Sequence, residues 1–339
     1  MNFCTLFDSY YMHKGLALYR SLLKNCLDFH LYIMAFDFPC YEKLKNLGLN
    51  NVTIRYICDF ETEELISLKD QRTKAEYCWT CGPAIIEYFI ETFSLNNCTY
   101  LDADLMFMAS PQIIFDEFDK SVSIAISEHF HNETIGGKYC VQFMYFRNDI
   151  EGRKCLKWWK ERCIEWCYAR YEDGKYGDQK YLDSFPLLFE NVYIIKNRGV
   201  GIAPWNMNFY TYDIKGENVI FNNRKYPCVF FHFHGTRVTC NSNELLLKAI
   251  TYDVSPKIER CFFLPYLDLL LEVYRIYFNV NLSSVKVEKR MFWERFYSFI
   301  KRKCKHSKVM QFLYYKVFKI RYDGYAVSYT HPEPTRLRC

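Results

Sequence analysis

The chain has 339 residues, of which 50% are hydrophobic and 19% aromatic. This is enough apolar material for a large core, and it excludes a disordered protein. The 44 lysines and arginines exceed the 39 acidic residues by only five, which is too little to indicate nucleic-acid binding. Sixteen cysteines are scattered along a chain with no secretory signal at its N-terminus, so we expect reduced thiols in the cytoplasm. No run of 18 apolar residues predicts a membrane-spanning helix.

Strands and helices alternate from the beginning of the chain. Residues 2–7, 30–36 and 52–57 have the apolar composition of strands, whereas 16–26 and 41–47 have helical periodicity. This alternation predicts an α/β fold with a mostly parallel sheet. A longer helix is expected to open at Gly82-Pro83.

Two carboxylates interrupt the strand that follows this helix. The apolar run beginning at Thr99 stops at Asp102 and Asp104 and resumes at Leu105. Side chains two residues apart in a strand point to the same side, so both acids can converge on one point. Charge inside an apolar run is expected to be paired or bound to metal. The functional interpretation is a Mg²⁺ or Mn²⁺ site that holds a diphosphate; the alternative is a surface turn with two solvated acids.

Three further acids lie where predicted elements end or begin. Asp8 ends the first strand, where it either caps a helix or reaches the same crevice as the paired acids. Glu128 ends the strand predicted at 122–127, and Asp178 follows a glycine-containing loop. Asp178 is a helix cap on one interpretation, and capping does not exclude contact with a substrate.

Two histidines lie close together near the end of a strand predicted at 229–233. His232 and His234 are expected on one face, beside Gly235. Such histidines are either hydrogen-bonded core residues or metal ligands, and the paired acids elsewhere favour ligation by one of them.

The C-terminal region, 251–339, is expected to be helical, and its charge is concentrated in 286–321. Twelve lysines and arginines face only Glu288 and Glu294 there, with aromatic residues interleaved. Basic helices of this composition bind anionic membrane surfaces. A solvated face or an RNA-binding tail are the alternatives, but no RNA-binding motif accompanies the segment, so nucleic acid is not an expected partner.

In this order, the motifs resemble those of GT-A glycosyltransferases, most closely family 8, whose bacterial members include lipopolysaccharide galactosyltransferases. Four motifs within residues 1–240 carry the resemblance. They are Asp8-Ser9-Tyr10, the D-x-D motif Asp102-Ala103-Asp104, Asp178-Gln179, and the H-x-x-G motif His232-Phe233-His234-Gly235.

The resemblance implies a GT-A catalytic domain over 1–250, with a nucleotide-sugar half at 1–110 and an acceptor half at 111–250. It also implies roles for individual residues. Asp102, Asp104 and His232, with His234 as its substitute, would bind Mn²⁺ or Mg²⁺ and the diphosphate. The donor would be held by Asp8, Tyr10, Arg237 and Lys74, with Arg72 as an alternative to Lys74. Asp178 and Gln179 would lie beside the donor sugar. Apart from the resemblance, an inverting reaction would need a carboxylate base, for which Glu128 is the first choice and Asp178 the second.

Two segments depart from the family pattern. The expected Lys-Pro-Trp after the H-x-x-G motif is replaced by Thr236-Arg237-Val238, and the expected Asn-Ala-Gly by Val141-Gln142-Phe143. We therefore expect a metal-dependent transferase that uses a nucleotide-diphosphate sugar, most simply a UDP-sugar. Its acceptor would be a glycan or lipid in bacterial surface polysaccharide or lipopolysaccharide synthesis, at the inner face of the cytoplasmic membrane. A sugar nucleotidyltransferase and a non-catalytic membrane-binding module remain the alternatives.

Overall fold

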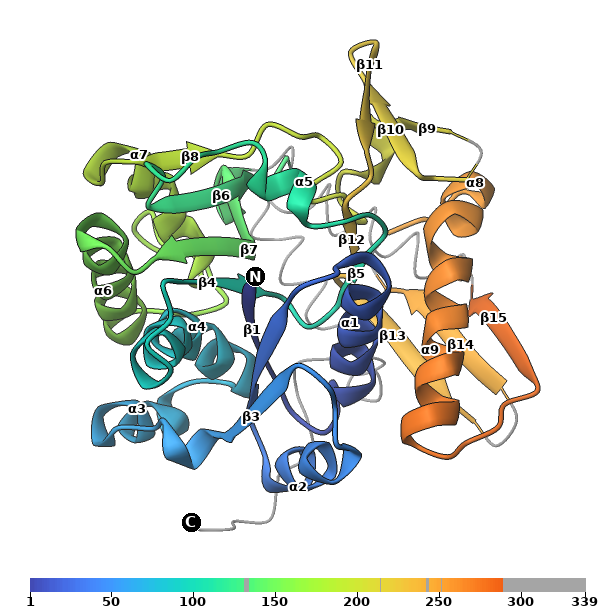
Figure 1. Ribbon diagram of the computed structural model, residues 1–339, viewed down its shortest axis with the longest axis horizontal. Coiled ribbons are helices and arrows are strands. Elements are labelled where there is room, and N and C mark those ends of the chain that lie inside the picture. Colours follow the sequence, from blue (N-terminus) through green and yellow to red (C-terminus); the bar gives the residue numbers. More distant parts are fainter. Residues whose placement is uncertain (131–133, 214, 242–243, 251, 289–339) are drawn as a thin grey trace, which may run out of the picture.

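The computed structural model describes residues 1–130, 134–213, 215–241, 244–250 and 252–288, and Figure 1 labels their helices and strands. The strands are β1 (Asn2–Phe7), β2 (His30–Ala35), β3 (Val52–Tyr56), β4 (Asn97–Leu101), β5 (Leu105–Phe107), β6 (Ile124–Glu128), β7 (Tyr139–Arg147), β8 (Val192–Ile194), β9 (Thr211–Tyr212), β10 (Asn218–Phe221), β11 (Arg224–Pro227), β12 (Phe230–His232), β13 (Thr236–Cys240), β14 (Glu244–Ala249) and β15 (Ser284–Glu288). The α-helices are α1 (Met12–Asn25), α2 (Phe38–Leu47), α3 (Glu63–Leu68), α4 (Lys74–Thr92), α5 (Gln112–Phe115), α6 (Ile150–Glu165), α7 (Phe185–Leu188), α8 (Pro256–Ile258) and α9 (Leu264–Tyr277).

The central sheet has seven strands in the order β3-β2-β1-β4-β7-β6-β8. Strand β7 is antiparallel to both of its neighbours, and the other pairings are parallel. The sequence prediction of a mostly parallel α/β sheet is therefore confirmed.

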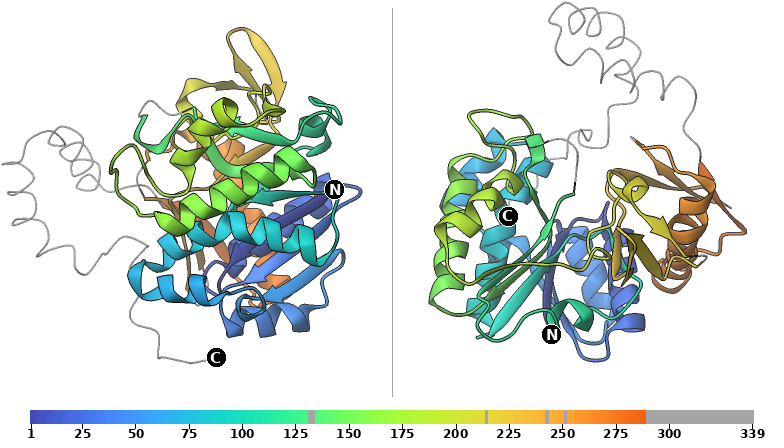
Figure 2. Two further views of the ribbon diagram at one scale, coloured as in Figure 1. Left: turned by 90° about the vertical axis from the view of Figure 1, so that its left-hand side faces the viewer. Right: turned by 90° about the horizontal axis from the view of Figure 1, so that it is seen from above.

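Side chains alternate between two cores on opposite faces of this sheet. In β1, Phe3 and Phe7 pack with α1, while Cys4 and Leu6 face the core beneath α4 and α6. Strand β2 alternates in the same way, because successive residues of a strand point to opposite faces. Both faces of the sheet are thus covered by helices, as Figure 2 shows.

Helices α4 and α6 lie side by side on one face (Figure 2). The start of α4 differs from the expectation: the helix begins at Lys74, and Pro83 lies inside it. Thr73 caps the helix by accepting from the Glu76 N–H, and the Glu76 carboxylate accepts from the Thr73 N–H at 2.8 Å. This reciprocal capping fixes the first turn.

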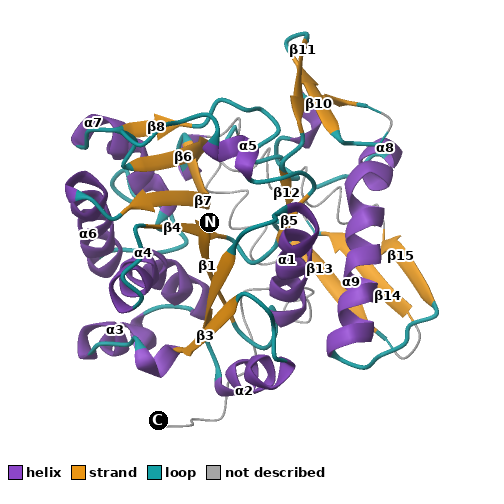
Figure 3. Cartoon of the chain, viewed as in Figure 1, coloured by secondary structure: helices purple, strands orange, loops and turns teal. Residues whose placement is uncertain are grey.

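A second group of strands lies beside the central sheet. Strand β5 pairs antiparallel with β12, and β14 pairs with β13 and β15 in a three-stranded sheet. Helix α9 packs on β14 and β15 (Figure 3) and is tied to α1 by Glu272, which pairs with Arg20 and Lys24.

The C-terminal region is helical in α9, but it also contributes strand β15, which was not expected. Of the basic segment 286–321, residues 286–288 end β15, and the remainder lies outside the described residues. In the described part of the chain, no helix combines the length and apolarity needed to cross a bilayer.

Candidate active site

Asp102 and Asp104 occupy the turn that joins β4 to β5. The Asp102 N–H donates to the Gln142 carbonyl of β7 at 3.1 Å, and the Leu105 N–H donates to the Asp102 carbonyl at 3.3 Å. This turn carries the chain from the central sheet into the β5–β12 ribbon. The two acids therefore lie beyond the carboxyl end of a central strand, where α/β sheets bind ligands.

Pairing of β12 with β5 brings His232 to these acids. His232 lies opposite Leu105 in the register, and its Nε2 is 3.0 Å from Asp104 Oδ1 and 3.6 Å from Asp102 Oδ2. His234 is exposed, with its ring centroid 5.6 Å from that of His232. Of the two histidines, His232 is the one in contact with the carboxylates.

Sequence reasoning missed three residues around this cluster. Lys14 of α1 places its Nζ 3.6 Å from Asp104 Oδ2, and Gln142 places Oε1 2.9 Å from His232 Nδ1. The Trp205 ring packs edge-on against the rings of His232 and His234. None of the three belongs to a recognised motif, although replacement of the expected glycine-containing segment by Val141-Gln142-Phe143 was a visible signal.

The surroundings shift the pKa values of the two carboxyls in opposite directions. Burial, followed by the charge of Asp104, raises the pKa of Asp102 to about 6, against the opposing effect of His232. Burial would also raise the pKa of Asp104, but His232 and Lys14 outweigh it and hold that pKa well below its usual value. Asp104 is therefore the more firmly ionised member of the pair.

The donor types fit a divalent cation, since two carboxylates and an imidazole suit Mn²⁺ or Mg²⁺. Among the described residues, however, no three His, Cys, Asp or Glu side chains already surround a point where a metal ion could sit. The imidazole instead contacts both carboxylates, and Lys14 lies against the other oxygen of Asp104. Metal binding would require His232 to exchange its contact with Asp104 for the ion.

Asp178 lies close to this cluster and is buried. Its Oδ2 approaches Gly82 of α4, where a Cβ atom would be 3.9 Å away. Burial and then the charge of Asp102 raise the pKa of Asp178 to about 8. The residue precedes a 3₁₀-helix, Gln179–Ser184, but its side chain makes no capping hydrogen bond, so the capping interpretation is wrong.

Gln179 turns toward a different loop. Its Nε2 donates to the Gly136 carbonyl at 2.6 Å and lies 3.4 Å from His129 Nδ1. It thereby ties the segment after β6 to the segment that contains Asp178.

Asp8 does not cap α1, because the N-cap position is Tyr11 and no side chain caps the helix, but its carboxylate holds the turn before the helix and contacts a cation. Its Oδ1 accepts from the Tyr11 N–H at 2.8 Å before α1, and its Oδ2 pairs with Lys74 Nζ at 2.5 Å. Tyr10, two residues after Asp8 in the chain, is exposed. Arg72, the alternative to Lys74, is buried and donates to Thr80 and to the Ile164 carbonyl.

The two remaining predicted residues, Glu128 and Arg237, lie on β6 and β13. Glu128 ends β6 and pairs with Arg198, whose guanidinium lies over the Phe130 ring. Arg237 is half-buried in β13, opposite Lys248 of β14.

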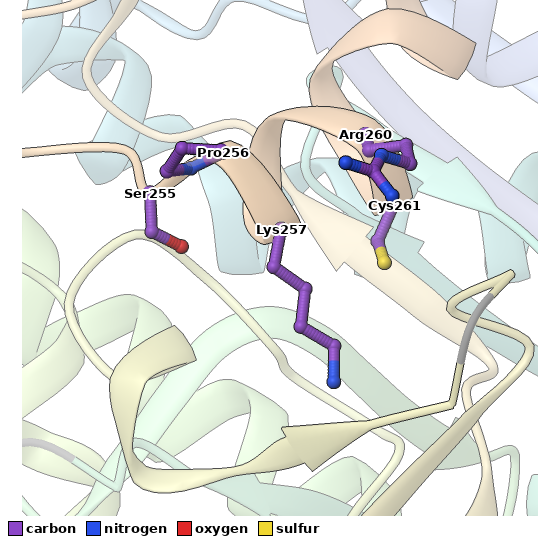
Figure 4. A pocket seen from close by; sticks show the side chains of 5 residues that line it. All are labelled: Ser255, Pro256, Lys257, Arg260 and Cys261. Atoms are coloured by element: carbon purple, nitrogen blue, oxygen red, sulfur yellow. The ribbon is translucent and has the colours of Figure 1, made fainter.

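A hollow of about 450 Å³ lies elsewhere, at the start of α8, and Figure 4 shows the five side chains that line it. It contains none of the predicted site residues.

Comparison with known proteins places this architecture. A crystal structure of the galactosyltransferase LgtC with donor and acceptor sugar analogs superposes with a TM-score of 0.50 at 13% identity, covering 80% of this chain and 95% of LgtC. The predicted fold, that of the GT-A glycosyltransferases, is therefore confirmed.

Sequence relatives define a narrower group. The uncharacterised protein YfnF of Bacillus subtilis (strain 168) is 33% identical over 248 residues, covering 70% of this chain and 82% of YfnF. YfnD of the same organism is 29% identical over 245 residues, covering 69% and 77% of the two chains. The chain belongs to the same family as YfnF. No protein-family model matches it.

Proposed function

We propose that the protein transfers a sugar from a nucleotide-diphosphate sugar, most simply a UDP-sugar, to a glycan or lipid-linked acceptor in bacterial surface polysaccharide or lipopolysaccharide synthesis. One observation carries the proposal: in a GT-A fold, Asp102, Asp104 and His232 meet beyond the end of β4. In α/β sheets, ligands bind beyond the carboxyl ends of the strands.

The cluster would hold Mn²⁺ or Mg²⁺, and the imidazole favours Mn²⁺. Such an ion supplies Lewis-acid stabilisation of the leaving diphosphate. Asp102 and His232 come from different parts of the fold, so the pairing of β12 with β5 sets the distance between these ligands. Gln142 orients His232 through the hydrogen bond to Nδ1.

The nucleotide would occupy the ends of β1 and β4. Asp8 is fixed there by the Tyr11 N–H and by Lys74, so its carboxylate can accept from the base or ribose. Tyr10 presents an exposed ring beside it. Lys74 and Arg237 would offset phosphate charge.

Asp178 and Gln179 would face the donor sugar. Burial raises the pKa of Asp178 to about 8, so its carboxyl would be able to donate a hydrogen bond to the sugar. A front-side reaction that retains the anomeric configuration needs no strong protein base, and the resemblance to family 8 favours this route. Glu128, at the end of β6, would serve the acceptor hydroxyl if a base is used.

The basic segment 286–321 would hold the enzyme on the anionic inner face of the cytoplasmic membrane, near a lipid-linked acceptor. Its composition supports this, since each basic residue near the headgroups adds about 1 kcal/mol.

The proposal is tested by measuring sugar transfer and donor hydrolysis by the Asp104→Ala variant. A screen of UDP-, GDP-, TDP- and CMP-sugars with Mn²⁺ first identifies a donor that raises the melting temperature. We then expect Asp104→Ala to lose sugar release, while Asp268→Ala, which removes an exposed acid from α9, retains it. Unchanged activity of Asp104→Ala contradicts the proposal. Consumption of a nucleoside triphosphate indicates the nucleotidyltransferase, and vesicle binding without turnover of any donor indicates the membrane module.

A further inference from the structure

Lys14, in the first turn of α1, is unusual because its side chain is buried. It lies in α1 with its side chain only 3% exposed, and a buried ammonium is unfavourable unless it is paired. Its Nζ is 3.6 Å from Asp104 Oδ2, and it donates to the Thr236 carbonyl at 3.0 Å. The buried charge therefore lies directly against a predicted metal ligand.

Three contacts hold the ammonium in place. Besides Asp104 and the Thr236 carbonyl, the Tyr11 ring lies beneath Nζ, 4.4 Å from its centroid. These partners come from the residue before α1, from the turn before β5 and from the start of β13. Lys14 thus occupies a fixed position, unlike an exposed lysine that samples several conformations.

The two oxygens of Asp104 face different groups. Oδ1 lies 3.0 Å from His232 Nε2, whereas Oδ2 lies 3.6 Å from Lys14 Nζ. A metal held by Asp102, Asp104 and His232 would lie on the His232 side of Asp104. Asp102 lies on that side too, because its Oδ2 is 3.6 Å from His232 Nε2. Only Oδ1 of Asp104 is directed to that side.

We propose that Lys14 is a positioning residue that keeps Asp104 Oδ2 occupied, so that Asp104 can bind a cation through one oxygen only. The inference rests on the proposed metal site of the transferase and deepens it. One-oxygen ligation suits Mg²⁺ and Mn²⁺, which take six ligands in octahedral geometry. Calcium takes six to eight oxygens and readily accepts a carboxylate through both. Lys14 therefore selects against Ca²⁺.

Charge alone does not produce this selectivity. Mn²⁺ and Ca²⁺ carry the same charge, so loss of the Lys14 ammonium strengthens the attraction of the site for both ions to a similar degree. The ratio of the two affinities changes only if the freed Oδ2 becomes a ligand. This ratio separates the positioning role from a general electrostatic one.

The test compares Lys14→Met and Lys14→Leu with the wild-type protein. Both variants remove the ammonium and place an apolar, helix-compatible side chain in a buried position. Lys24→Met, on the same helix, is the matched control, because Lys24 is 53% exposed and pairs with Glu272 instead. Binding is measured on the full chain without nucleotide, from the free Mn²⁺ signal in electron paramagnetic resonance and its displacement by Ca²⁺.

We expect the affinity for Ca²⁺ relative to Mn²⁺ to rise by about tenfold or more in both Lys14 variants, because Ca²⁺ gains a second carboxylate oxygen. Lys24→Met should leave the ratio unchanged. An unchanged ratio in a folded Lys14 variant overturns the inference, as does a wild-type protein that binds neither ion. Sugar turnover is assayed separately: a shifted ratio without turnover of any donor overturns the transferase proposal and leaves this inference standing.

Discussion

The central sheet and the β5–β12 ribbon contribute to the same site but are assembled differently. In the sheet, β1, β2 and β3 are neighbours in both sequence and space, joined by helical crossovers. In the ribbon, Leu105 pairs with His232, which lies far along the chain. Asp102 follows β4, which the central sheet holds between β1 and β7, whereas His232 is placed by the pairing of β12 with β5.

This difference indicates where the site is vulnerable. Gln142 bridges the two parts, since its backbone carbonyl accepts from the Asp102 N–H and its side chain bonds His232. Gly201 leaves the room for that side chain, because a Cβ there would lie 2.4 Å from Gln142 Nε2. Substitutions in the ribbon should disturb the cluster more than equally destabilising substitutions in the helices that cover the sheet.

The largest effect is expected from Phe231→Ala in β12. Phe231 is fully buried and stacks on Phe262 at a centroid distance of 4.6 Å. Loss of such a side chain leaves a cavity and should lower the free energy of unfolding by about 3–5 kcal/mol. Urea denaturation measures the loss, and faster amide hydrogen exchange at residues 230–233 reports local opening of the ribbon.

Phe89→Ala in α4 is the matched control for this prediction. Phe89 is also fully buried, but it packs against Tyr32 on the other side of the central sheet. We expect a similar loss of stability without faster local exchange at 230–233. If both variants open β12 equally, the ribbon does not behave as a separate unit, and the comparison fails.

A smaller effect is expected from Gln142→Met. The thioether side chain has similar length but cannot bond His232 Nδ1, which then lies buried without its partner. An unsatisfied buried polar group should reduce the free energy of unfolding by about 1–3 kcal/mol. Gln112→Met, on the exposed surface of α5, should change it by less than about 0.5 kcal/mol. Equal effects of the two changes would mean that Gln142 does not couple the sheet to the ribbon.

Much of the central sheet could be predicted, because periodicity and strand alternation are local signals. The interruption of an apolar run by Asp102 and Asp104 is likewise a local signal, and it pointed to the candidate site. The start of α4 was misjudged because Gly82-Pro83 was given more weight than Thr73 and Glu76, whose reciprocal hydrogen bonds begin the helix.

Lys14 could not be assigned from sequence for a different reason. A lysine within a helical segment is ordinarily exposed, and its burial here depends on Asp104 and Thr236, which reach it only through the tertiary fold. Gln142 was visible as a departure from the family pattern, but its partner His232 becomes apparent only once β12 pairs with β5.

The smallest effect tests the sheet side of the comparison through pH. Burial would raise the pKa of Glu76, but hydrogen bonds from the N–H groups of Ala169 and Thr73 outweigh it and lower that pKa below 4.5. A lowered carboxyl pKa contributes stability that is present above the unfolded value and lost as the pH falls through the folded value. Glu76→Ala should therefore reduce the free energy of unfolding by about 1–2 kcal/mol at pH 7, and its difference from wild type should shrink below about pH 4.5.

Glu76→Gln is the matched variant, because it keeps an acceptor oxygen and loses the charge. Its stability should lie between those of wild type and Glu76→Ala at pH 7, and the difference between the two variants should be independent of pH. Neither variant should speed amide hydrogen exchange at 230–233. Glu76 links α4 to the segment after α6, and both belong to the central-sheet part of the fold, not to the β5–β12 ribbon. A stability difference between wild type and Glu76→Ala that stays constant down to pH 3 would show that the carboxylate's charge does not stabilise this junction.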